Sequence, residues 1–92
     1  MKTDYVNGIP VRCWDAGKKW ADRYTVLYTK HGNKGLSNGR GMSSNPFSPN
    51  GCGMYIEAYA GTHLGKRIPF SELPEKCKKA VEMDLKPNTE ER

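Results

Sequence analysis

The sequence predicts a small α+β fold, in which an antiparallel β-sheet of three to five strands carries one C-terminal helix. Residues 23–30 form an uninterrupted run of strongly β-favouring residues with alternating side chains, which predicts a central strand. Residues 71–86 repeat apolar side chains at helical spacing, which predicts the helix. Between these elements, residues 31–53 are rich in Gly, Ser and Asn, a composition typical of a long loop.

The first half of the chain predicts a β-hairpin. Residues 9–14 form the first strand, and Pro10 places the start of that strand on a sheet edge. Residues 15–19 then supply turn chemistry, so the first strand pairs antiparallel with the central strand. In the central strand, alternation places Tyr24, Val26 and Tyr28 on one face.

The glycine-rich stretch 31–53 predicts an irregular loop. Residues 36–42 can form only a weak strand, because three glycines lie in or beside them. Residues 45–51 predict a pair of turns, with Phe47 inserted into the core between two prolines. We therefore expect the second half of the loop to be ordered and the first half, through Arg40, to be freer.

The last third of the chain predicts two strands and the helix. Residues 54–60 alternate and form a third strand beside the central one. Residues 66–70 form a short edge strand that Pro69 ends or confines to the edge of the sheet. Ser71 caps the helix, Pro74 lies in its first turn and Pro87 ends it. The apolar stripe that packs on the sheet comprises Leu73, Cys77, Ala80, Val81 and Leu85.

The length of 92 residues predicts one domain, with a core over about residues 6–86 and a flexible tail over 87–92. No apolar run is long enough for a membrane span, and the first residues do not resemble a secretory signal. We therefore expect a soluble, cytosolic protein that does not bind membranes.

The three cysteines are widely spaced, which argues against a disulfide framework and a zinc ribbon. Free, mostly buried thiols are the expectation, without a metal site or a cofactor. Cys52 and His63 flank a predicted strand and therefore lie too far apart for nucleophilic catalysis. No Walker or dinucleotide-binding pattern is present, so we expect no nucleotide hydrolysis. We also expect no small-molecule substrate.

The charge distribution favours an acidic or phosphate-bearing partner. The net charge is +5, and the first 45 residues carry eight Lys or Arg against three acids. Candidate binding residues are two lysines and a tryptophan at the predicted hairpin tip and five polar residues beyond it: Lys18, Lys19, Trp20, Lys30, Asn33, Lys34, Asn38 and Arg40. From the residues alone, nucleic-acid contact and a structural loop remain equally open. A lid over the core is the alternative for Trp20.

Several motifs are similar to those of small proteins of phages and other mobile elements. They are Asp22-Arg23-Tyr24-Thr25, Gly41-Met42-Ser43 followed by Asn45-Pro46-Phe47 and Pro49, and Gly65-Lys66-Arg67-Ile68 with Phe70 and Leu73-Pro74. Within that group, residues 9–85 most resemble phage anti-CRISPR proteins of the type I-F class, in particular its eighth described family.

The resemblance implies an inhibitor without enzymatic activity that acts in the cytoplasm of the infected bacterial host. Such a protein binds Cas proteins of the crRNA-guided type I-F surveillance (Csy, or Cascade) complex and touches the guide RNA, so that target DNA cannot pair with it. The alternative is a small phage nucleic-acid-binding accessory or regulatory protein. Tight binding to the assembled complex favours the first hypothesis, and salt-dependent binding to naked nucleic acid favours the second.

Overall fold

A β-hairpin forms the centre of the fold. The computed structural model describes residues 4–19, 21–33, 36–51 and 53–86. Strand β2 (Ile9–Asp15) pairs antiparallel with β3 (Tyr24–Asn33), with Val11 opposite Tyr28 and Asp15 opposite Tyr24. Where the turn leaves the strands, the amide of Ala16 donates to the carbonyl oxygen of Arg23 at 2.8 Å. The predicted hairpin is therefore confirmed.

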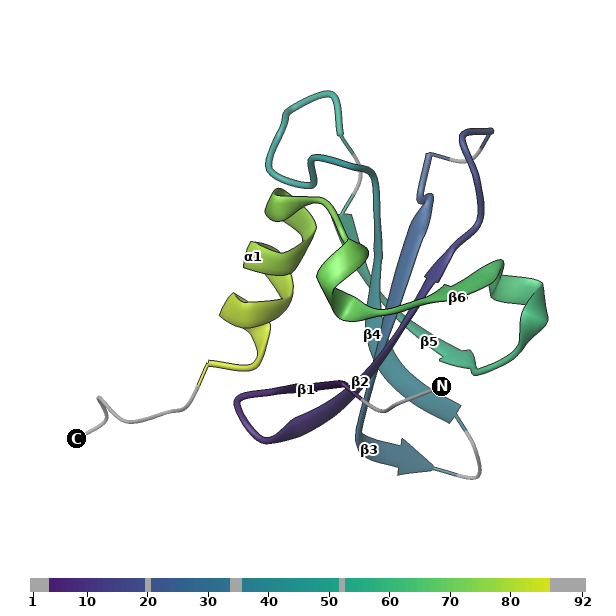
Figure 1. The fold of residues 1–92 in the computed structure, drawn as a ribbon, viewed down its shortest axis with the longest axis vertical. Helices are drawn as coiled ribbons and strands as arrows, with labels where there is room; N and C mark the ends of the chain where they lie inside the picture. The colour runs from purple at the N-terminus through teal and green to yellow at the C-terminus, as the bar shows by residue number, and fades with distance from the viewer. Residues whose placement is uncertain (1–3, 20, 34–35, 52, 87–92) are drawn as a thin grey trace.

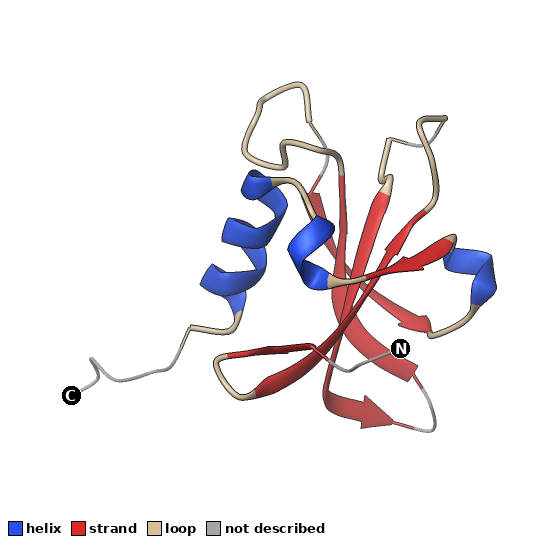
Figure 2. Ribbon diagram, in the orientation of Figure 1, coloured by secondary structure: helices blue, strands red, loops and turns tan. Residues whose placement is uncertain are grey.

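Four further strands complete a six-stranded antiparallel sheet in the order β1-β2-β3-β4-β5, with β6 paired to β2. They are β1 (Asp4–Val6), β4 (Leu36–Met42), β5 (Gly53–Tyr59) and β6 (Lys66–Ile68). Both β1 and β6 pair with the same strand, β2, at opposite ends of its length. The helix lies against one face of this sheet (Figures 1 and 2), so the predicted α+β class is confirmed.

The start of β2 is not on a sheet edge, which corrects the expectation drawn from Pro10. Pro10 lies opposite Tyr5 of β1, an unpredicted strand. Asn7 and Gly8 connect the two strands with φ angles of 51° and 82°. Positive φ at both positions gives the turn whose twist suits a tight hairpin. The side-chain amide of Asn7 also donates to the carbonyl oxygen of Leu85, at 3.1 Å.

The glycine-rich stretch forms a full strand, so the prediction of an irregular loop from residue 31 to Arg40 is wrong. Strand β4 lies between β3 and β5 and pairs with both. Consequently residues 53–59 pair with β4 and not with the central strand. At Gly39, an added Cβ atom would overlap the carbonyl oxygen of Val26. Glycine here permits the close approach of β4 to β3, which propensity alone counts as a weakness.

The remaining irregular segment, residues 43–51, contains the expected turns. The amide of Ser48 donates to the carbonyl oxygen of Asn45 at 3.2 Å, and that of Gly51 donates to Ser48 at 2.9 Å. However, the prediction that Phe47 anchors this loop in the core is wrong, because its side chain is 49% exposed. The loop closes through its own hydrogen bonds, including one from the Phe47 amide to the Asn45 side chain.

Helix α1 (Glu75–Asp84) follows two short 3-10 helices, η1 (Thr62–Leu64) and η2 (Phe70–Glu72). Pro74 is the N-cap residue and no side chain caps this end, so the cap predicted at Ser71 is wrong. Ser71 belongs to η2, which delays the start of the helix. Helix α1 ends at Asp84, and the predicted stop at Pro87 and the tail lie outside the described residues.

The predicted helix stripe is confirmed. Its buried members are Leu73, Cys77, Ala80 and Val81, and Leu85 is half-buried. These side chains belong to the same core as four side chains of the sheet, Val11, Cys13, Val26 and Met42. Burial of this apolar area, worth about 25 cal/mol per Å², holds the two layers together. Within the described part of the chain, no helix is long and apolar enough to cross a membrane.

Candidate functional site

The predicted binding residues do not form one site, because they lie towards opposite ends of β3. Lys18 and Lys19 are exposed in the turn that leads into β3. Lys30 and Asn33 belong to the last part of β3, beyond Tyr28. An extended chain from Tyr24 to Lys30 spans roughly 20 Å. Trp20 and Lys34 lie outside the described residues.

The other two candidates, Asn38 and Arg40, are side by side on the helix face of β4. Asn38 lies opposite Tyr28, and Arg40 lies opposite Val26. Neither belongs to a loop. The Arg40 side chain forms hydrogen bonds with Asp84 and Tyr55, which the sequence did not predict.

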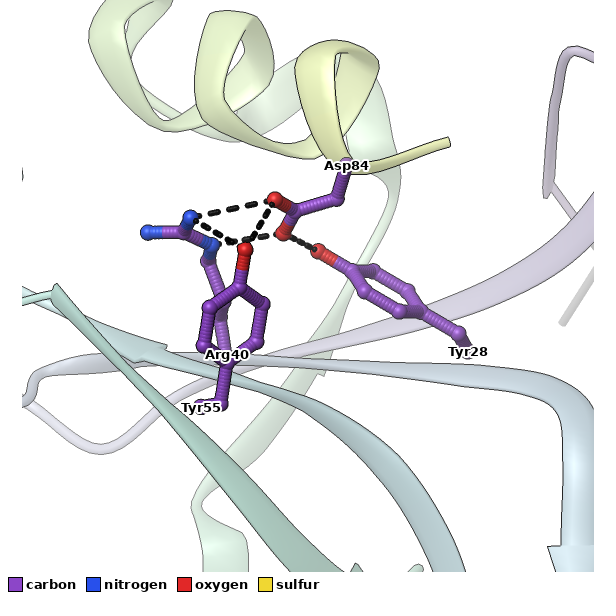
Figure 3. A network of polar contacts seen from close by, with 4 residues as sticks. All are labelled: Tyr28, Arg40, Tyr55 and Asp84. Atoms are coloured by element: carbon purple, nitrogen blue, oxygen red, sulfur yellow. Dashed lines mark hydrogen bonds and ion pairs between the residues drawn. The ribbon is translucent and has the colours of Figure 1, made fainter. Parts of the chain in front are cut away.

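Arg40 belongs to a polar network around the Asp84 carboxylate that joins the sheet to the end of the helix (Figure 3). The Nε and Nη2 atoms of Arg40 are two of its donors. Nε donates to Oδ2 of Asp84 at 2.5 Å, and Nη2 donates to Oδ1 at 3.0 Å. Tyr28 donates to Oδ2 at 2.6 Å, and Tyr55 donates to Oδ1 at 3.0 Å. The Asp84 carboxylate therefore accepts four hydrogen bonds, from three strands of the sheet.

This network compensates for an unfavourable helix terminus. An acid in the last turn of a helix meets the negative end of the helix dipole. The Arg40 guanidinium lies against the Asp84 carboxylate, whose side chain is only 7% exposed. Hydrogen bonding to Asp84 raises the pKa of Arg40, and burial together with the hydrogen bond to Asp84 raises the pKa of Tyr28. Both groups therefore keep their protons throughout the physiological range.

A groove of about 740 Å³ opens beside the network, between the end of α1 and strands β3–β5. Its wall combines aromatic rings, one exposed acid and the amide of Asn38. The lining residues are Tyr28, Asn38, Gly39, Tyr55, Ile56, Glu57, Asp84 and Leu85. An open groove of this kind suits a peptide or a protein segment better than a small molecule, which needs an enclosed pocket.

Strand β5 forms the rim of the groove and the edge of the sheet. It pairs with β4 on one side, and no described strand pairs with its other side. Three large side chains on it are exposed: Met54 (53%), Tyr55 (71%) and Tyr59 (57%). Unpaired backbone groups and exposed aromatic side chains along one edge are typical of a surface that docks another protein.

At the other end of the sheet, the β2–β3 turn presents its two lysines on a braced backbone. Asp15 accepts hydrogen bonds from Arg23 at 2.7 and 2.9 Å and from the Gly17 amide at 2.9 Å. The bond from Arg23 is the main reason that the pKa of Asp15 is lowered. Lys18 and Lys19 are thereby held at the tip of the turn with no carboxylate paired to them among the described residues.

Two of the three cysteines are described, and both are free and buried, as predicted. Burial raises the pKa of Cys13 to about 12 and that of Cys77 to about 11. The Cys77 thiol donates to the carbonyl oxygen of Ser43 at 3.1 Å, and so helps to fix the loop onto the helix. In the described part of the chain, no group of His, Cys, Asp and Glu residues is arranged to hold a metal ion.

Sequence reasoning missed Asp84 and Tyr55. Asp84 was visible in the sequence as an acid in the last turn of a predicted helix, where the dipole favours bases, and such a position calls for a compensating cation. Its partner Arg40 is distant in sequence, so no local pattern pairs them. No family model, curated protein or solved structure matches this chain.

Proposed function

We propose that this protein is a non-enzymatic phage inhibitor that binds the type I-F crRNA-guided surveillance complex and blocks its hybridisation with target DNA. The observation that carries the proposal is the outer edge of β5, with which no strand of the described residues pairs, and its exposed side chains Met54, Tyr55 and Tyr59. An edge strand can extend its hydrogen bonding onto the backbone of a Cas subunit, while its aromatic side chains anchor the contact.

The charge of the chain supports the second half of the proposal, contact with the guide RNA. Most of the net charge of +5 comes from the N-terminal half, and Lys18 and Lys19 are exposed at the tip of an ordered turn. Target recognition begins with a short seed of RNA–DNA pairs, so occupying a few guide nucleotides is enough to stop it. Lys30, Asn33, Lys34 and Asn38 remain candidate guide RNA contacts, although Lys34 lies outside the described residues.

The buried thiols support an inhibitor that acts by binding. A nucleophilic cysteine requires a lowered pKa and access to substrate. Cys13 and Cys77 have raised pKa values and lie in the core. The Asp84 carboxylate is likewise unsuited to accept a substrate proton, because four donors already occupy it.

The test is a gel shift with the purified surveillance complex and a matching double-stranded target. The protein should co-migrate with the complex and abolish target binding. Met54→Ala combined with Tyr59→Ala should weaken this inhibition at least tenfold, because both side chains leave the docking edge. Met83→Ala is the matched control, since Met83 is equally exposed (58%) but lies on the helix. Target binding that is unaffected by a stoichiometric excess of protein would reject the proposal.

The accessory nucleic-acid-binding protein is the second candidate, favoured by the exposed pair Lys18 and Lys19. It predicts binding to naked DNA or RNA whose affinity falls steeply with salt. It also predicts that the Met54 and Tyr59 substitutions leave that binding unchanged. The same set of variants therefore distinguishes the two candidate functions.

A further inference from the structure

A second, basic pocket lies on the sheet face that α1 does not cover. Arg12 and Trp14 alternate along β2 with Val11 and Cys13, which point into the core under the helix. Arg12 and Trp14 therefore point to the opposite face. On β6, Arg67 lies directly opposite Trp14 in the antiparallel register. Strands β2 and β6 lie side by side in Figure 1, and Arg12 and Arg67 line the same pocket.

The pocket has a volume of about 330 Å³ and is lined by Arg12, Trp14 and Arg67 together with the segment that leads from β5 to β6. That segment contributes Gly61, Thr62 and Gly65. No acidic residue is among the described residues that line it, so the pocket carries two positive charges without a compensating carboxylate.

The two arginines are held differently. The guanidinium carbon of Arg67 lies over the ring of Trp14, 5.3 Å from the ring centroid, and the ring itself is buried. The Nε–H of Arg12 is buried and has no acceptor within the described part of the protein. An unsatisfied buried donor is costly, and a bound ion that supplies the missing acceptor is one of the explanations for such a donor in a folded protein.

We propose that Arg12 and Arg67 form a phosphate-binding site for the backbone of single-stranded RNA. Guanidinium groups match phosphate oxygens with paired hydrogen bonds, and a non-bridging oxygen would satisfy the Arg12 Nε–H. The pocket volume exceeds that of one phosphate group, which leaves room for the attached sugar, and Thr62 is among the lining residues. The stacked Arg67–Trp14 pair offers a planar cationic surface on which an unpaired base can lie.

This inference deepens the proposed function and rests on it only for the identity of the strand as guide RNA. Binding of free oligonucleotide to the pocket requires no surveillance complex. Failure of the pocket and failure of the inhibitor proposal are therefore distinguishable, because the first is read with RNA alone and the second with the complex and target DNA.

The test is a titration of the protein labelled with nitrogen-15, in which the Nε–H signals of Arg12 and Arg67 are followed by NMR as a short oligouridine is added. Both signals should shift and saturate together. Arg12→Gln and Arg67→Gln should each weaken binding about tenfold, the loss expected for one charge-assisted contact. Lys76→Gln, an equal change of net charge on the exposed face of α1, is the control and should leave the affinity unchanged.

Inorganic phosphate and an oligoglutamate are titrated in parallel to identify the source of the anion. Oligouridine must bind more tightly than either. Equal or tighter binding of inorganic phosphate or of the acidic peptide would overturn the assignment to a nucleic-acid strand, as would unchanged oligouridine affinity in both arginine variants. Folding of the variants is checked by thermal unfolding. Arg12→Met should unfold at the same or a higher temperature, because it removes an unsatisfied buried donor, and a markedly lower temperature would indicate a purely structural role.

Discussion

Asp84, the last residue of α1, and Arg40, in the middle of β4, form a two-point ion pair with distances of 2.5 and 3.0 Å. The pair joins the helix to the part of the sheet that carries the β5 edge, because Tyr55 of β5 donates to the same carboxylate. The shape of the groove and the position of the docking edge therefore depend on one acidic side chain.

Asp84→Asn should destabilise the protein by about 3 kcal/mol, because it leaves the Arg40 guanidinium without its charged partner at a largely buried position. Urea unfolding followed by circular dichroism measures the change. Glu75→Gln is the control, since the Glu75 side chain is 88% exposed in its ion pair with Lys78 and should leave the midpoint unchanged. Equal midpoints for both variants would show that the network adds nothing to stability.

Gly39→Ala should prevent β4 from pairing closely with β3, because its new methyl group would overlap the carbonyl oxygen of Val26. A loss of about 3 kcal/mol or more, or failure to fold, is expected from such overpacking of backbone. At Gly41 the nearest atom to an added Cβ is the Asp22 side chain at 3.4 Å, an ordinary contact. Gly41→Ala should therefore be tolerated. Thermal unfolding of the two variants measures the difference, and equal loss in both would contradict the close approach at Gly39.

Alkaline pH should unfold the protein. Burial raises the pKa of Cys13 to about 12 and that of Cys77 to about 11, and it also raises the pKa of Tyr28. As pH rises, the unfolded chain therefore releases these protons before the folded chain does. The contribution of these groups to stability is complete below about pH 8.5 and is lost as the pH rises to about 11 or 12. Urea midpoints measured across this range test the slope.

The Tyr28 hydroxyl contributes to stability at neutral pH and to the loss of stability at alkaline pH. Tyr28→Phe should lower stability by about 1 kcal/mol at neutral pH, because Asp84 loses one donor. The same variant should show a shallower decline in stability at high pH, since one titrating group has been removed. A decline as steep as that of the parent protein would exclude Tyr28 from the titration.

Lys18→Gln combined with Lys19→Gln should weaken association with the surveillance complex and reduce its salt dependence, because two exposed cations leave the hairpin tip. Stability should be unchanged, since neither lysine pairs with an acid among the described residues. Surface plasmon resonance at several salt concentrations measures both effects. Lys76→Gln with Lys79→Gln, which makes the same change of charge on α1, should leave the affinity as it was.

The parts of the fold that local patterns encode were predictable. The β2–β3 hairpin follows from alternation and turn chemistry, and the apolar stripe of α1 follows from its spacing. The β1–β2 hairpin was also encoded, in the Asn7-Gly8 pair, although it was not anticipated. Strand β4 was not predictable from propensity, because Gly39 is required by its contact with β3 although a glycine in a strand is unfavourable when the sequence is read alone.

The candidate site was less accessible to sequence reasoning, because its contacts are non-local. Arg40 meets Asp84 only after the sheet has formed and the helix has packed on it. Likewise, Arg12 and Arg67 share a pocket because β6 returns to pair with β2. In contrast, the sequence could place Lys18 and Lys19 at a hairpin tip, because that turn is formed by residues close to one another in the sequence.

The contacts of the first hairpin also determine when the protein can become complete during its synthesis. Asn7 donates to Leu85, and Asp4 accepts a hydrogen bond from the Phe70 amide at 2.9 Å. A ribosome delivers the N-terminal residues first, at about 5–20 residues per second, so these partners emerge several seconds after the hairpin that needs them. The contacts that Asp4 and Asn7 make with the last third of the chain therefore cannot form until residues 70–85 have been synthesised.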